Sequence, residues 1–226
     1  MAGNLKAFLA EFVGTFALVF VSAGAVCADA VTGGRLGLTG IALAYGLALA
    51  AMSLTFGRAC GGQFNPAITA ALLLNRRMNL IRGVLFVAAQ LLGAALAGIL
   101  LRAALHTHEE LLTAAPFLGA CDMGSGVGFK AGTLLEAVAT FFLACASMAP
   151  GDSRGGGGQA AGGCVLAAAV LVLGPLTGAA LNPARAFGPA VATGHWSNWF
   201  VYWIGPVTGA VPAVFLYGNL YAEKTK

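Results

Sequence analysis

The chain has 226 residues, of which 59% are hydrophobic and only 9% are charged, and its mean hydropathy is +0.85. This composition excludes a soluble globular domain and indicates an integral membrane protein. The formal net charge of +4 is small, and we expect no nucleic-acid partner.

Six apolar segments predict six membrane-spanning helices, near residues 7–28, 36–56, 83–101, 134–148, 162–176 and 199–217. The first follows Lys6 and contains Glu11, which argues against a cleavable signal peptide. Between the third and fourth segments the sequence becomes polar and irregular, as in an external connector. Most Lys and Arg residues fall on the other side of this arrangement, so the positive-inside rule predicts that both termini are cytoplasmic.

The tripeptide Asn-Pro-Ala occurs twice, first as Asn65, Pro66 and Ala67 and again as Asn182, Pro183 and Ala184. Asn is a preferred helix N-cap, and Pro is tolerated at the first helical position because its missing N–H would have no partner there. Each tripeptide therefore predicts the start of a helix. The apolar runs that follow are about 12 to 14 Å long at 1.5 Å per residue, which is about half of the hydrocarbon core.

A half-helix inside a membrane leaves its first N–H groups and its positive dipole end near the bilayer midplane. Such backbone is tolerated only where it is buried in protein or lines a wet cavity. Two half-helices in one chain therefore predict a pore or a binding site between their ends.

The chain also contains an internal repeat. EFVGTF, which begins at Glu11, matches EAVATF, which begins at Glu136, and in each half an Asn-Pro-Ala follows after one further span. Each half thus holds three spans and one half-helix, over about residues 7–103 and 130–222. Because three is odd, the second half enters the membrane from the opposite face. We expect one all-α membrane domain over residues 1–226, built as an inverted three-plus-three repeat.

These features resemble the aquaporin, or major intrinsic protein, family over nearly the whole chain. The resemblance rests on both Asn-Pro-Ala boxes, on Arg185 directly after the second box, on the Glu-x-x-x-Thr-Phe openings of both halves, and on YWIGPVTGA in the last span. It implies an aquaporin-like fold with one pore per chain and a homotetramer in the plasma or inner membrane. It implies no cofactor and no enzymatic activity.

The resemblance further implies a narrow filter, whose positions follow from their spacing to the two boxes: Tyr45, Val170, Ala179 and Arg185. Water-only members usually carry His at the position of Val170. Val with Ala and Arg resembles nodulin-like plant members, which pass more than water. Glycerol facilitators, however, usually carry Asp where this chain has Ala186, and this difference favours water.

Carboxylates within membrane spans are costly unless they have partners. Glu11 and Glu136 could couple proton movement, but we expect them instead to accept hydrogen bonds from N–H groups of the re-entrant loops, and so to support the pore wall. The run HTHEE at residues 106–110 is a weak metal-binding pattern. A solvated connector is the favoured interpretation, and we expect no metal site.

Our leading hypothesis from the sequence is a passive channel for water that excludes protons and ions. Asn65 and Asn182 would donate hydrogen bonds to water at the pore centre, and Arg185 would add a positive charge near the outer mouth. The alternative is a facilitator of glycerol, urea, ammonia, hydrogen peroxide or metalloid acids. A secondary active transporter would need a coupling carboxylate facing the pore, and an enzyme would need a paired nucleophile and base; the sequence indicates neither.

Overall fold

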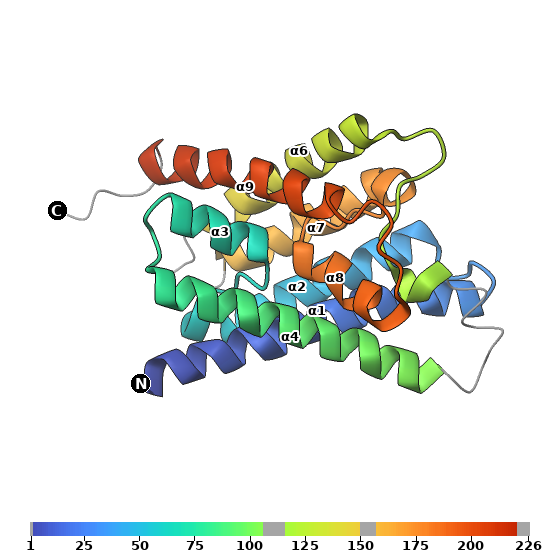
Figure 1. Ribbon diagram of the computed structural model, residues 1–226, viewed down its shortest axis with the longest axis horizontal. Coiled ribbons are helices and arrows are strands. Elements are labelled where there is room, and N and C mark those ends of the chain that lie inside the picture. The colour runs from blue at the N-terminus through green and yellow to red at the C-terminus, as the bar shows by residue number, and fades with distance from the viewer. Residues whose placement is uncertain (1, 106–115, 150–156, 221–226) are drawn as a thin grey trace.

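The protein is a bundle of long helices that run roughly side by side (Figure 1). The structure, a computed structural model, describes residues 2–105, 116–149 and 157–220. Within these residues there is no β-strand, and six helices are long and apolar enough to cross a bilayer. They are α1 (Ala2–Val31), α2 (Gly37–Cys60), α4 (Leu80–Leu105), α6 (Phe129–Met148), α7 (Gly157–Thr177) and α9 (Val201–Leu220). The predicted all-helical class and its six spans are confirmed.

Two short helices, α3 (Pro66–Leu74) and α8 (Pro183–Thr193), begin where the Asn-Pro-Ala boxes predict. In each box the Asn side chain caps the helix, since its Oδ1 accepts the N–H of the Ala two residues later, at 2.9 Å in both cases. The α8 helix ends at Thr193 and is capped by Gly194, which has the left-handed φ of 75° that glycine adopts without strain. A single-turn 3-10 helix, η1 (Pro116–Gly119), follows α4 in the described part of the chain.

The two halves of the chain have the same arrangement of helices. The first and last long helices of each half pack together, α1 with α4 and α6 with α9, and α2 packs on α7 across the halves. Each half-helix packs mainly on the last long helix of the other half of the chain, α3 on α9 and α8 on α4. Figure 1 shows α3 and α8 end to end between α4 and α9. We call the end of the bundle where α1 begins and α9 ends the inner end, and the opposite end the outer end.

Glycine permits the close approach of the paired helices. A Cβ atom on Gly209 of α9 would lie 1.9 Å from the carbonyl oxygen of Ala137 on α6, and one on Gly93 of α4 would lie 2.4 Å from that of Phe12 on α1. These are equivalent contacts in the two halves. The glycines at 205 and 209 therefore serve packing within one chain, as small residues commonly do between membrane helices.

Large apolar side chains cover the outside of the bundle, which is the arrangement expected of a surface in contact with lipid. Leu47, Leu134 and Phe215 are each more than 60% exposed. The possible metal-binding run at residues 106–110 lies outside the described residues.

Candidate functional site

The tips of the two half-helices are joined by reciprocal hydrogen bonds. The Nδ2 group of Asn65 donates to the carbonyl oxygen of Leu181 at 2.8 Å, and Nδ2 of Asn182 donates to that of Phe64, also at 2.8 Å. A side-chain amide carries two N–H groups. Each Asn therefore keeps a second N–H beyond the one that joins the tips, at the point where both positive helix ends meet.

The loops that lead to both tips are strained and need support. Phe64 has a φ of 47° and Leu181 a φ of 51°, a left-handed conformation that is costly for residues other than glycine. Buried carboxylates hold this backbone in place. Glu11 accepts hydrogen bonds from the N–H groups of Gln63 at 3.3 Å and Phe64 at 2.8 Å. It also accepts one from the side chain of Gln90 at 2.7 Å.

Glu136 occupies the equivalent place in the second half. It accepts hydrogen bonds from the N–H groups of Ala180 at 3.1 Å and Leu181 at 2.7 Å, and from the hydroxyl of Thr177 at 2.6 Å. Neither Glu136 nor Glu11 has any exposed surface. Since these donors occupy both oxygens of each carboxylate, the two residues are placed to fix the re-entrant loops rather than to face a solute.

A narrow cavity runs past the joined tips and has an empty volume of about 350 Å³. Tyr45 and Arg185 line it on the outer side of the tips, and Ser147 lines it near the inner end of α6. The remaining lining residues are Leu18, Leu49, Gln63, Asn65, Ile68, Leu143, Leu166, Ala180 and Asn182. Apart from the two Asn side chains and Gln63, the middle of the cavity has an apolar wall, so few groups compete with the amides for a polar molecule.

Arg185 is the charged residue of this cavity and is only 2% exposed. One of its terminal nitrogens, Nη2, donates to the Tyr45 hydroxyl and to the carbonyl oxygen of Gly119, the latter at 2.8 Å. Its Nε and Nη1 groups have no partner among the described protein atoms. A buried guanidinium with unused donors on a cavity wall is suited to bind a polar molecule there.

A second, wider cavity lies on the outer side of Tyr45 and has an empty volume of about 830 Å³. Val170 and Tyr45 both line it, and the hydroxyl of Tyr45 also accepts a hydrogen bond from Arg185. Ala179 is buried and borders neither cavity, whereas its neighbour Ala180 lines the narrow one. The place of Ala179 in the filter therefore stays a prediction.

Comparison with known proteins shows to which family the chain belongs. The family model described as major intrinsic protein matches residues 1–217. The chain belongs to that family.

Among the relatives of this major intrinsic protein is Aquaporin TIP4-4 from Zea mays. The two chains are 40% identical over 229 residues, which cover 97% of this chain and 88% of the relative. Probable aquaporin TIP3-2 from Oryza sativa subsp. japonica is also 40% identical, over 98% of this chain and 84% of the relative. The fold matches the X-ray structure of the aquaglyceroporin from Plasmodium falciparum with a TM-score of 0.86, over 97% of each chain at 22% identity.

The sequence interpretation of this major intrinsic protein missed three residues that hold the site together. Gly119 binds Arg185 through its backbone carbonyl, and no side-chain pattern predicts such a contact. Gln90 and Thr177 support the buried carboxylates. Gln90 was detectable, because it is a polar residue in a span that is otherwise apolar.

Among the described residues there is no group of three or more His, Cys, Asp or Glu side chains placed to hold a metal ion. The polar groups on the wall of the narrow cavity are the amides of Gln63, Asn65 and Asn182, the hydroxyls of Tyr45 and Ser147, and the guanidinium of Arg185.

Proposed function

We propose that the protein is a passive channel for water that excludes protons and other ions. The observation that carries this proposal is the pair of joined half-helix tips, because it puts two spare amide donors beside one narrow cavity that also contains the unused donors of Arg185. Water can accept hydrogen bonds from all of these groups as it passes. The family membership of the chain supports the same class of activity.

Ion exclusion follows from the same arrangement. Two positive helix ends and one guanidinium oppose a cation in the narrow cavity. A water molecule whose oxygen accepts hydrogen bonds from Asn65 and Asn182 points its own hydrogens away from them. It then cannot pass a proton along the file at that point.

The proposal is tested in proteoliposomes that contain only the purified protein. In osmotic stopped-flow experiments we expect them to shrink at least several times faster than empty vesicles, with a low activation energy, and to show no proton leak above that of empty vesicles. If they shrink no faster than empty vesicles, the proposal is wrong.

The second candidate is a facilitator of small neutral solutes such as glycerol, urea, ammonia, hydrogen peroxide or metalloid acids. It is favoured by Val170, an aliphatic residue on the outer cavity beside Tyr45, because that position offers a solute no polar contact. Uptake of each solute by the same vesicles separates the two candidates. Val170→His adds bulk and a polar group, so it should lower uptake of the larger solutes several-fold more than that of water. An equal loss for all solutes would remove Val170 from the filter.

The protein is a multi-pass membrane protein, and we propose that it forms homotetramers in the plasma or inner membrane with both termini cytoplasmic. Two features support this. The end of α2, the connection from α3 to α4 and the start of α4 lie at the inner end of the bundle (Figure 1), and these segments carry Arg58, Arg76, Arg77 and Arg82. An apolar groove with an empty volume of about 920 Å³, between α6 and α7, offers a surface for a neighbouring chain. Native mass spectrometry tests the tetramer, and a mass of one chain in mild detergent would contradict it.

A further inference from the structure

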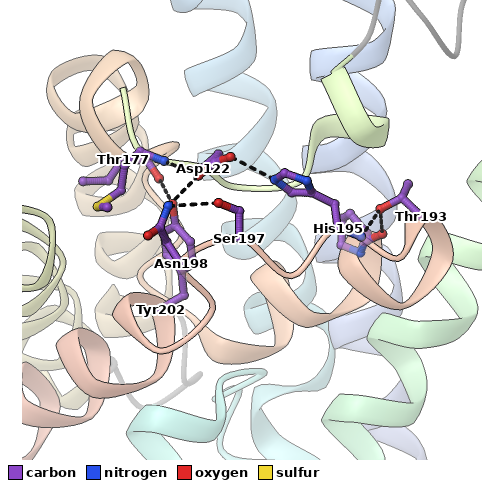
Figure 2. Close-up of polar contacts among 9 residues, drawn as sticks. Asp122, Thr177, Thr193, His195, Ser197, Asn198 and Tyr202 are labelled. Carbon is purple, nitrogen blue, oxygen red and sulfur yellow. Dashed lines mark hydrogen bonds and ion pairs between the residues drawn. The ribbon is translucent and has the colours of Figure 1, made fainter. Parts of the chain in front are cut away.

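A polar cluster outside the filter connects two loops at the outer end. The carboxylate of Asp122 accepts a hydrogen bond from the side chain of Asn198 at 3.0 Å, and its other oxygen lies 2.9 Å from Nε2 of His195 (Figure 2). The ring of His195 also stacks on Phe117, with ring centroids 3.8 Å apart. The cluster therefore attaches the segment 117–122 to the turn that follows α8.

This segment carries the carbonyl group that binds the filter arginine. Gly119, whose carbonyl oxygen accepts from Arg185, lies between the two attachment points, Phe117 and Asp122. The backbone between them is strained, since Phe117 and Leu118 have φ values of 49° and 55°. Such a conformation persists only where the surrounding contacts hold it. Phe117, Gly119 and Asp122 all line the wide outer cavity, so a shift of this segment changes the mouth of the channel.

We propose that Asp122 and His195 are positioning residues of the filter, which hold the Gly119 carbonyl on Arg185 and do so more firmly when His195 is protonated. This inference rests on the proposed channel function. It extends that function by making the choice between water and larger solutes depend on pH at the outer face.

The direction of the pH effect follows from the partners. Burial opposes ionisation of Asp122, but hydrogen bonds from Asn198, from the N–H of Met123 and from His195 outweigh it and hold the pKa of Asp122 below its ordinary value. The carboxylate is therefore charged across about pH 5 to 8, the range in which histidine ordinarily gains its proton. Protonation of His195 converts its hydrogen bond to the Asp122 carboxylate into an ion pair between two charged groups, and it adds a cation–π contact with Phe117. Acid pH thus tightens the attachment.

Neighbouring groups do not supply a competing charge change. Cys121 and Tyr202 border the same small cavity as His195, and thiols and phenols ordinarily ionise above this pH range. Arg102 of α4 donates to the carbonyl of Ala192 at the end of α8, and a guanidinium ordinarily stays charged throughout this range. Among the described residues near the cluster, His195 is the one of a type that ordinarily changes charge between pH 5 and 8.

The test measures urea and water permeability of proteoliposomes buffered on both sides at pH 5.5 and at pH 8. In the wild type we expect the urea-to-water ratio to be about two- to fivefold higher at pH 8, a modest change because the pair is partly exposed to solvent. His195→Gln keeps a donor but cannot gain a charge, so its ratio should be the same at both pH values. Asp122→Asn removes the carboxylate, and its ratio should be high at both.

The other histidines of the chain, His106 and His108, provide matched controls, because His106→Gln and His108→Gln should keep the wild-type pH profile. The positioning role would be overturned if the urea-to-water ratio of the wild type were the same at both pH values. This includes the case in which urea does not pass at either pH. An unchanged pH profile in His195→Gln would also overturn it. In either case fast water flow would still support the proposed channel function. Vesicles that conduct no water would overturn both the channel function and the positioning role.

Discussion

Replacing Arg185 with valine is expected to let protons or small cations leak through the channel while water still passes. The guanidinium is buried on the wall of the narrow cavity. A cation about 5 Å away meets a repulsion of about 3 kcal/mol at an effective dielectric constant of about 20. Removal of this barrier corresponds to an increase in leak rate of about a hundredfold. The smaller valine also widens the passage between Tyr45 and Gly119, so water permeability should not fall.

The leak is measured with a pH-sensitive dye inside vesicles, under a potassium diffusion potential. Two control variants separate the effect of the positive charge in the pore from the effect of side-chain shape and from the effect of the protein's net charge. Arg185→Lys keeps the positive charge but replaces the planar guanidinium whose Nη2 donates to Tyr45 and Gly119, so it should still exclude protons. Arg102→Val removes a positive charge that binds the end of α8 rather than the pore, and it should not leak. If Arg185→Val excludes ions as well as the wild type does, the half-helix ends alone provide the barrier.

The half-helices could be predicted from the sequence because their cause is local. An Asn cap and a Pro at the first helical position specify where α3 and α8 begin, and the length of the apolar run specifies where each stops. The inverted repeat then follows from counting spans. The observed long helices extend beyond the predicted spans, for example at Leu80–Leu105 against residues 83–101. Hydropathy marks the part inside hydrocarbon, whereas the hydrogen-bonded helix continues past it.

Contacts made by backbone groups or by distant loops could not be predicted in the same way. The role of Gly119 depends on its carbonyl oxygen, which every residue has. Spacing from the second box indicates Ala179 as a filter position. The loop before Asn182 contains left-handed φ values at Gly178, Ala179 and Leu181, and Ala180, which the spacing does not indicate, lines the narrow cavity. Counting residues from the Asn-Pro-Ala box does not reveal this backbone conformation.

The two halves also use different side chains for the same task. Each re-entrant loop is held by a glutamate, but Glu11 receives its third hydrogen bond from Gln90 of α4, whereas Glu136 receives it from Thr177 at the end of α7. Tyr202 binds the carbonyl of Thr177 at 2.9 Å and so connects α9 to the same point. The repeat therefore preserves the function of the carboxylate, while its supporting contacts come from different helices.

Replacing Glu136 with leucine should have the largest effect on stability. Its carboxylate is completely buried and is the acceptor for the N–H groups of Ala180 and Leu181. A buried donor left without an acceptor costs about 1–3 kcal/mol, so the two together cost about 2–6 kcal/mol, a large share of a typical margin of about 5–15 kcal/mol. We expect little folded protein and, in what folds, a strong loss of water permeability. Glu136→Gln keeps one acceptor oxygen and should lie between wild type and Glu136→Leu.

Thermal unfolding in detergent, together with water permeability per folded molecule, measures this effect. Glu11→Leu should behave like Glu136→Leu, because Glu11 accepts equivalent N–H groups from Gln63 and Phe64. Leu134→Ala provides the control, since this residue is on the same helix as Glu136 but is 63% exposed on the outer surface and should change neither quantity appreciably. A Glu136→Leu protein with wild-type melting temperature and flux would show that the loop before Asn182 holds its strained backbone without the carboxylate. The support would then have to come from the reciprocal bonds between the two Asn-Pro-Ala tips.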